Sequence, residues 1–198
     1  MVLEIKPLTP DRVDDFFRFF EQIAFAEHPE WGCECYCCFY HATSEQEWKE
    51  RTAAQNRDIA RQMILAGHMS GLLAYADGLP VGWCHYDGKP NLPGLSVFTP
   101  AAMTIGQPDA GAIVCFTIAQ GYRNRGIAGR LLDAACADLA ARGYRTAEAY
   151  PRPADCTSVE ENYHGPLAMF LNRGFVPTSS GDSQVIVRKD LQSGRELI

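Results

Sequence analysis

The stretch from Val114 to Gly143 constrains the fold of this chain most strongly. An apolar run over residues 111–118, GAIVCFTI, leads into it without polar alternation, which predicts a strand buried on both faces. Gly143 stands where a left-handed residue commonly ends a helix. Between them, apolar residues recur with the period of one helical face: Leu131, Leu132, Ala135, Cys136, Leu139 and Ala140. A buried strand, a turn and an amphipathic helix in this order indicate an α/β fold.

The turn between this strand and helix carries an unusual charge. Arg123, Arg125 and Arg130 crowd the N-terminus of the helix, although the whole chain has a net charge of −6. The positive end of a helix dipole attracts carboxylates rather than arginines. A bound anion would resolve this conflict, because the N–H groups of the first helical turn lack partners within the helix. Phosphate is the anion that we expect.

The remaining pattern extends the α/β prediction to residues 1–198 as one domain. Strand and helix signals follow the order β-α-α-β-β-β-α-β-α-β-β without an internal repeat or a linker, so we expect a mixed central sheet of about six to seven strands flanked by helices. Residues 1–70 should form a strand, two helices and a cysteine-rich segment, and residues 71–191 a hairpin, the strand-turn-helix unit and the C-terminal strands. Among these elements are a first helix entered at Thr9-Pro10, a second over 44–67, a hairpin turn at Asp77-Gly78, an irregular loop over 87–108, a strand over 145–150, a helix over 166–173 and a strand over 184–188.

Composition narrows the classes of function. The acidic balance argues against a general nucleic-acid binder and leaves the arginine cluster as a local exception. No apolar stretch approaches the length of a membrane span, and residues 1–6 lack the basic and then apolar order of a signal peptide. We therefore expect a cytoplasmic protein with no nucleic-acid or membrane partner. Its eight cysteines should be free thiols or metal ligands rather than disulfides.

Two motifs in the second half of the chain resemble signatures of the GNAT superfamily of acetyl-coenzyme A-dependent N-acyltransferases. The first signature is Arg or Gln, two residues, Gly, one residue, then Gly or Ala, and residues 123–128, RNRGIA, fit it between a strand and a helix. The second commonly reads Leu-Tyr, three residues, Gly-Phe, and residues 169–175, MFLNRGF, are similar to it. The resemblance covers the chain well from about residue 72 to residue 191.

A narrower bacterial group, for which we know no common substrate, is also similar. Its members carry a Cys-aromatic-Cys stretch near the N-terminus, a Cys-Phe pair before the glycine motif, an Ala-Tyr-Pro strand end and a Tyr-x-Gly element. The matching residues are Cys35-Tyr36-Cys37, Cys115-Phe116, Ala149-Tyr150-Pro151 and Tyr163-His164-Gly165.

The resemblance implies an N-acetyltransferase that moves an acetyl group from acetyl-CoA to a primary amine of a small molecule or a protein. Phe116, Thr117 and Ile118 would contact the pantetheine arm through the strand backbone. The pyrophosphate would be wrapped by main-chain N–H groups of Arg123, Asn124, Arg125, Gly126, Ile127, Ala128 and Gly129. Homodimers are common in the superfamily, although this chain shows no interface signature of its own.

The catalytic groups are less well marked. The superfamily usually places a tyrosine, which protonates the departing thiolate, where this chain has Phe170, so we take Tyr163 as the acid, with His164 second. Tyr163 as a mere anchor of its loop is the alternative. Glu148 is our candidate base, because it shares a strand face with Thr146 and Tyr150 that could border the cleft. A strand carboxylate paired with a nearby arginine is the alternative for Glu148.

The segment from Trp31 to His41 leaves two questions open. Its cysteines and histidine, namely Cys33, Cys35, Cys37, Cys38 and His41, could bind zinc, but their spacing lacks the paired Cys-x₂-Cys of structural sites. We therefore assign no metal and favour thiols that line the pocket or the core. The segment also keeps an alternative function, a non-catalytic acyl-CoA-binding sensor. An aromatic acceptor pocket could be formed by Trp31, Tyr36, Phe39, Tyr40, Trp83 and Tyr86, although core and loop packing is the simpler explanation for these residues.

Overall fold

The computed structural model describes residues 2–26, 34–104, 107–153, 161–180 and 184–192. Its centre is one mixed sheet of seven strands in the order β1-β2-β3-β4-β5-β7-β6, in which only the β4–β5 pair is parallel. The predicted α/β architecture with six to seven strands is confirmed. The strands are β1 Leu3–Pro7, β2 Gly71–Ala76, β3 Leu79–Gly88, β4 Gly111–Ile118, β5 Thr146–Ala149, β6 Val176–Ser180 and β7 Val185–Asp190.

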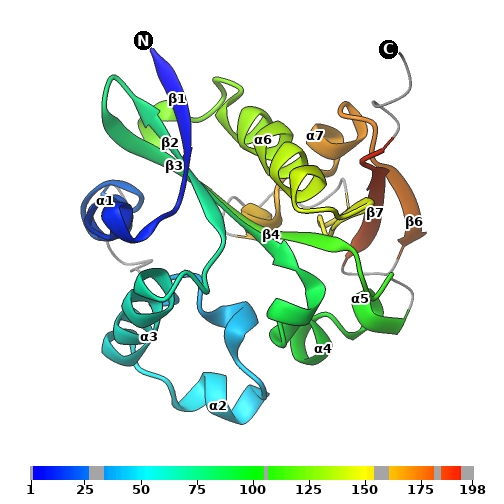
Figure 1. Cartoon of the computed structure of the whole chain (residues 1–198), viewed down its shortest axis with the longest axis horizontal. Coiled ribbons are helices and arrows are strands. Elements are labelled where there is room, and N and C mark those ends of the chain that lie inside the picture. The colour runs from blue at the N-terminus through cyan, green and yellow to red at the C-terminus, as the bar shows by residue number, and fades with distance from the viewer. Residues whose placement is uncertain (1, 27–33, 105–106, 154–160, 181–183, 193–198) are drawn as a thin grey trace.

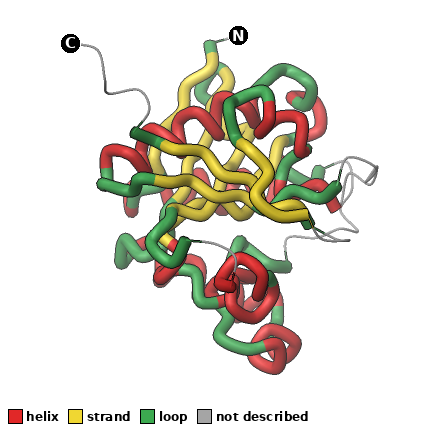
Figure 2. Tube along the Cα trace, turned by 90° about the vertical axis from the view of Figure 1, so that its right-hand side faces the viewer, coloured by secondary structure: helices red, strands yellow, loops and turns green. Residues whose placement is uncertain are grey.

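Helices cover both faces of the sheet and gather below it (Figures 1 and 2). The α-helices are α1 Val13–Arg18, α2 Glu45–Glu50, α3 Ala53–Leu65, α4 Gly94–Phe98, α5 Pro100–Thr104, α6 Ile127–Ala141 and α7 Leu167–Leu171. A π-helical turn, η2, continues α1 over Phe19–Ile23. None of the helices in the described part of the chain is long and apolar enough to cross a membrane.

Each face of the sheet has its own hydrophobic core. On one face, Leu131, Leu132 and Leu139 of α6 are fully buried against a cluster that includes Ala147 and Ala149 of β5. On the other face, aromatic residues of α1 and η2 pack around Trp83 of β3. The alternation along the strands therefore sends neighbouring residues into two different cores. Three layers result, with α6 on one side and the α1–η2 segment on the other.

Two turns adopt the backbone conformation that their sequences demand. Asp77 and Gly78 join β2 to β3 with φ of +49° and +83°, as expected for a two-residue hairpin turn of the Asp-Gly type. Gly143 follows the last turn of α6 with a φ of +93°, a left-handed conformation that glycine adopts at little cost. Both sequence predictions are confirmed.

The single helix predicted over 44–67 is wrong, because the chain forms two helices there. Ser44 caps α2, with its hydroxyl accepting a hydrogen bond from the Glu47 N–H at 3.1 Å. The chain then extends at Arg51 (ψ 130°) and Thr52 (ψ 161°). Thr52 and Gln55 form a second capping box that starts α3. The segment over 87–108, expected as an irregular loop with room for one helical turn, contains two short helices, α4 and α5.

The feature of the sheet that creates a site is the divergence of β4 from β5. The parallel pairing between them ends at Ile113 and Ala149. At the same point the register of β4 with β3 shifts, so that Val114 has no partner opposite it on β3. The rest of β4, as far as Ile118, runs away from β5 and opens a gap that side chains from other segments reach.

Candidate active site

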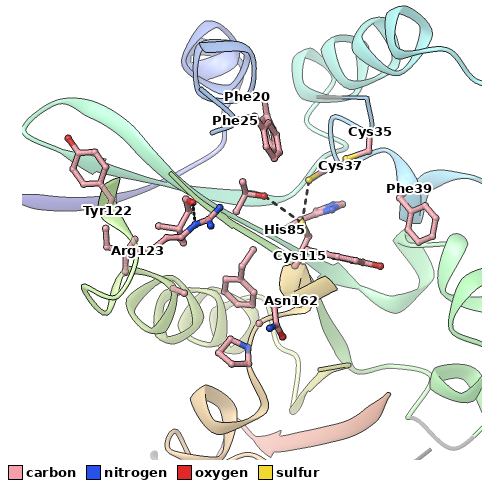
Figure 3. A pocket seen from close by; sticks show the side chains of 18 of the residues that line it. Phe20, Phe25, Cys35, Cys37, Phe39, His85, Cys115, Tyr122, Arg123 and Asn162 are labelled. Atoms are coloured by element: carbon pink, nitrogen blue, oxygen red, sulfur yellow. Dashed lines mark hydrogen bonds between the residues drawn. The ribbon is translucent and has the colours of Figure 1, made fainter. Parts of the chain in front are cut away.

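A cavity of about 960 Å³ lies along the part of β4 that has left β5. Figure 3 shows its two ends, with Tyr122 and Arg123 at one and Cys35, Cys37 and Phe39 at the other. We call these the glycine-turn end and the thiol end. The lining residues that the structure describes are Phe20, Phe25, Glu34, Cys35, Cys37, Phe39, Tyr40, Trp48, His85, Cys115, Phe116, Thr117, Ile118, Tyr122, Arg123, Asn124, Gly126, Ile127, Ala128, Asn162, Tyr163, Gly165 and Pro166.

The glycine-turn end is formed by the tight turn that enters α6. Gly126 is the N-cap of this helix, with a φ of +75°, and Asn124 before it also has a positive φ of 59°. Glycine supplies no capping side chain, and the first turn of α6 contains no acidic residue. No described atom lies within 4 Å of the position that a Cβ on Gly126 would take. Backbone N–H groups at a helix start with open space before them suit an anion such as a phosphate.

Most residues predicted to hold the cosubstrate line this cavity. They are Phe116, Thr117, Ile118, Arg123, Asn124, Gly126, Ile127 and Ala128. Arg125 and Gly129 are not among the lining residues. The Arg125 guanidinium lies 5.4 Å from the ring centroid of Tyr122, and Gly129 is covered by Arg173, whose Nε donates to its carbonyl oxygen at 3.0 Å. Gly129 therefore lets the Arg173 side chain pack closely on α6, because a Cβ at this position would collide with Arg173.

The three arginines at the start of α6 make different contacts. Arg123 lines the cavity, and its Nε donates to the Ile118 carbonyl at 3.0 Å, which ties the turn to the end of β4. Arg130 donates to the carbonyl oxygen of Leu3 in β1 at 3.2 Å. Only Arg123 of the three stands in the cavity wall. The sequence argument that arginines at this helix start indicate a bound anion therefore holds for Arg123 alone.

Tyr163 lies in the cavity wall near Cys115, on the segment that precedes α7. Burial raises its pKa, while a hydrogen bond with Tyr40 acts in the opposite direction. A phenol with a raised pKa keeps its proton at neutral pH. Tyr163 therefore presents a protonated hydroxyl group on a residue of the cavity wall.

His164, the second candidate acid, is directed away from the cavity. Its Nδ1 lies 3.0 Å from the Val114 carbonyl oxygen and its Nε2 3.2 Å from Nε2 of Gln184. Because a carbonyl can only accept, Nδ1 carries the proton and Nε2 accepts from the Gln184 amide. Burial lowers the pKa of His164 to about 4, so the ring is neutral. His164 supports the bulged part of β4 and the loop that carries Tyr163.

The fold does not place Glu148, the predicted base, in the cavity wall with Tyr163, the predicted acid. The Glu148 side chain is fully buried and absent from the cavity wall, with Oε2 2.5 Å from Lys89 Nζ and Oε1 2.8 Å from Arg188 Nε. The backbone N–H of Gln107 also donates to Oε1 at 2.8 Å. A carboxylate held by two cations is a poor base, because deprotonating a substrate would break both ion pairs. This geometry corresponds to the alternative reading of Glu148, a strand carboxylate paired with an arginine, and we withdraw it as the base.

We expect Glu148→Gln to destabilise the protein rather than to disable its chemistry. The amide would remove the ion-pair partner of the buried Lys89 ammonium, and breaking a buried pair costs about 3–5 kcal/mol. Urea denaturation should show this loss, while the exposed control Glu45→Gln, which removes the Lys49 pair, should leave the midpoint of unfolding nearly unchanged. A stable Glu148→Gln protein with a hundredfold lower turnover would return Glu148 to the mechanism.

Thiols and a histidine pair form the other end of the cavity. Cys37 Sγ lies 3.9 Å from Cys115 Sγ and accepts a hydrogen bond from Trp83 Nε1 at 3.0 Å. A hydrogen bond with Cys37 lowers the pKa of Cys35 to about 7, whereas the pKa of Cys37 is raised. His85 lines the cavity beside them (Figure 3).

The histidine pair that backs this end is uncharged. His85 Nε2 lies 3.2 Å from Nε2 of His41, and only one of these two atoms can carry the shared proton. Burial lowers the pKa of His85 to about 3 and that of His41 to about 4, so both rings are neutral at physiological pH. The pair therefore presents polar atoms but no positive charge.

The cysteines of the Trp31–His41 segment are directed to different places. Cys35 and Cys37 line the cavity, whereas Cys38 is fully buried and its thiol faces the Asn56 carbonyl oxygen at 3.3 Å. Among the described residues, no three His, Cys, Asp or Glu side chains are grouped so that they could hold a metal ion. Cys33 lies outside the described residues.

The aromatic pocket differs in membership from the one that the sequence indicated. Phe39 and Tyr40 line the cavity, but Tyr36, Trp83 and Tyr86 do not, and Trp31 lies outside the described residues. Sequence reasoning missed the aromatic lining residues Phe20, Phe25, Trp48 and Tyr122. The sequence signal available for Phe20 was the group of aromatic residues Phe16, Phe17 and Phe20 in the first predicted helix. In the structure, Phe20 packs on Trp83 and also lines the cavity.

Comparison with known proteins identifies the class to which this fold and cavity belong. The sequence matches the model of the acetyltransferase (GNAT) family over residues 17–160. The chain therefore belongs to the GNAT acetyltransferase family. No curated protein matches the sequence significantly.

Solved structures share the fold at low sequence identity. PaiA N-acetyltransferase from Thermoplasma acidophilum in complex with coenzyme A has a TM-score of 0.53 and 15% identity, covering 96% of this chain and 99% of that one. The GNAT domain of S. lividans PAT has a TM-score of 0.57 and 18% identity, with 95% and 90% covered. An aminoglycoside N-acetyltransferase, AAC(6')-Iy, in complex with CoA has a TM-score of 0.53 and 14% identity, with 91% of each chain covered. The seven-stranded arrangement is thus a GNAT fold.

Proposed function

We propose that this protein transfers the acetyl group of acetyl-CoA to the nitrogen of a primary amine. The observation that carries the proposal is one continuous cavity that runs from the N-terminus of α6 at one end to an aromatic and thiol-rich chamber at the other. The two solved relatives that contain coenzyme A support the assignment of the glycine-turn end to the donor. The thiol end then remains for the acceptor.

In this proposal the donor is held by the residues already described. N–H groups at the start of α6 and the Arg123 side chain would receive the pyrophosphate, and the edge of β4 beyond Ile113 would pair with the pantetheine arm. Tyr163 would protonate the thiolate as it leaves. The acceptor must arrive as a free amine, and an apolar chamber assists this because desolvation lowers the pKa of an ammonium group.

The test is the release of free thiol from acetyl-CoA in the presence of a panel of amines. Time-dependent release with an amine, together with a product heavier by one acetyl group in mass spectrometry, is the expected result. Coenzyme A binding without release on any acceptor would contradict the proposal. That outcome would favour a non-catalytic acyl-CoA-binding sensor, for which Phe170 at the usual tyrosine position is the observation.

Several finer expectations belong to the same proposal. They are acetyl rather than a longer acyl group, membership of the subgroup with the Cys35-Tyr36-Cys37 stretch, a cytoplasmic location and a homodimer. Competition between acetyl-CoA and longer acyl-CoA thioesters tests the first. Light scattering of the purified protein tests the last.

A further inference from the structure

The wall of the thiol end is mainly apolar and aromatic. Phe20, Phe25, Phe39 and Trp48 face it together with the thiols of Cys35, Cys37 and Cys115. Figure 3 shows Phe20 and Phe25 above β4 and Phe39 across from them beside the cysteines. A chamber of this chemistry gains free energy by removing apolar surface of a ligand from water.

These rings are held in place before any ligand binds. Phe39 is stacked on Phe98 at a centroid distance of 4.0 Å and meets Trp48 edge-on at 5.1 Å. Phe20 packs on Phe16 at 4.7 Å and on Trp83 at 6.2 Å. Preorganised aromatic walls favour a rigid ligand, because little side-chain entropy is lost on binding.

Charged groups are scarce in the same wall. Glu34 and Arg123 are the only Asp, Glu, Lys or Arg among the described lining residues. Arg123 belongs to the glycine-turn end (Figure 3), and Glu34 is an exposed residue that lines the cavity next to Cys35. The histidine pair adds no charge, since His85 and His41 are neutral. Among the described lining residues, an acceptor with several ammonium groups would find one carboxylate, and each further ammonium would face a mainly apolar wall, which is unfavourable.

We propose that the acceptor is a primary monoamine carried on an aromatic or other apolar body, and not a polyamine or an amino sugar. This inference rests on the proposed function and specifies its substrate class. The apolar body would lie between the rings of Phe39 and Phe20. The single amine would point along β4 toward Thr117 and Tyr163, where the thioester of the donor would be held.

The test compares three acceptors under identical conditions with acetyl-CoA: 2-phenylethylamine, spermidine and kanamycin. We expect kcat/KM for 2-phenylethylamine to exceed that for the other two by roughly 100-fold, the scale of discrimination that an unpaired buried polar group produces. Preferred turnover of spermidine or kanamycin would overturn the substrate class and leave acetyl transfer intact. Thiol release with none of the amines would overturn both.

A matched pair of variants tests the position of the acceptor. Phe39→Leu keeps the wall apolar, so the preference for 2-phenylethylamine over spermidine should persist with a higher KM. Phe39→Glu places a carboxylate in the wall, so the preference should fall by roughly tenfold or more because an ammonium then finds a partner. Calorimetric binding of CoA should be equal in both variants, which shows that the donor end has folded. A preference unchanged by Phe39→Glu would overturn the placement.

Discussion

Gly126→Glu should abolish the binding of acetyl-CoA, with a rise in Kd of roughly 100-fold or more. The substitution would place a carboxylate at the start of α6, where the pyrophosphate is expected. Repulsion between the two anions and the loss of access to the first-turn N–H groups act together. Isothermal calorimetry with acetyl-CoA measures the effect directly.

Two controls separate charge from backbone strain in this experiment. Gly126→Ala forces a side chain into the same left-handed conformation, with a φ of +75°, but adds no charge. Gly143→Ala does the same at the other end of α6, where φ is +93° and no described atom lies within 4 Å of the new Cβ. Both should lower stability by about 1 kcal/mol. The Gly143→Ala variant should bind acetyl-CoA normally. Tight binding of acetyl-CoA by Gly126→Glu would refute the assignment of the pyrophosphate to the start of α6.

The sequence predicted those parts of the fold and site that depend on neighbouring residues. The turn from Arg123 to Ala128 is contiguous, so its glycine, its charge and its flanking strand and helix could be read together. The Asp77-Gly78 turn and the end of α6 at Gly143 are local in the same sense. Local backbone preferences and hydrophobic periodicity carry this information without knowledge of tertiary contacts.

The parts that sequence reasoning missed depend on partners far apart in the chain. Glu148 has the alternation expected of a strand beside a cleft, but Lys89 and Arg188 neutralise it, and neither was evident as its neighbour. The opposite face of the same strand was predicted correctly, since Ala147 and Ala149 do pack in the core with α6. Which face of a strand meets a cavity is decided by the tertiary fold, and alternation alone cannot give it.

The lining of the thiol end was only partly predicted, for the same reason. Phe20, Trp48 and Cys115 come from three separate elements and line one cavity, which lies along the part of β4 that has left β5. The aromatic residues that were considered are distributed between core and cavity: Trp83 is fully buried, while Phe39 is half-buried in the wall. Aromatic side chains therefore belong to the core or to the cavity wall according to how deeply they are buried. The amino-acid composition does not give this depth.

Tyr163→Phe should lower turnover by roughly 100-fold or more while leaving the affinity for CoA unchanged. The phenyl ring of the variant would still fill this place in the cavity wall, but it has no hydroxyl proton to give to the departing thiolate. Because burial raises the pKa of Tyr163 above the ordinary tyrosine value of about 10, the acid form persists through neutral and mildly alkaline pH. The wild-type rate should therefore fall only when the pH rises above about 10, and the variant should lack this decline.

Tyr122→Phe is the matched control, since Tyr122 also lines the cavity but lies at the glycine-turn end beside Arg123. It should retain turnover within roughly threefold of the wild type. Tyr40→Phe should lie between the two, because it removes the hydrogen bond that Tyr163 shares with Tyr40 and leaves the Tyr163 hydroxyl in place. Unchanged turnover in Tyr163→Phe would assign this residue to anchoring its loop, and the thiolate would then have to take its proton from solvent.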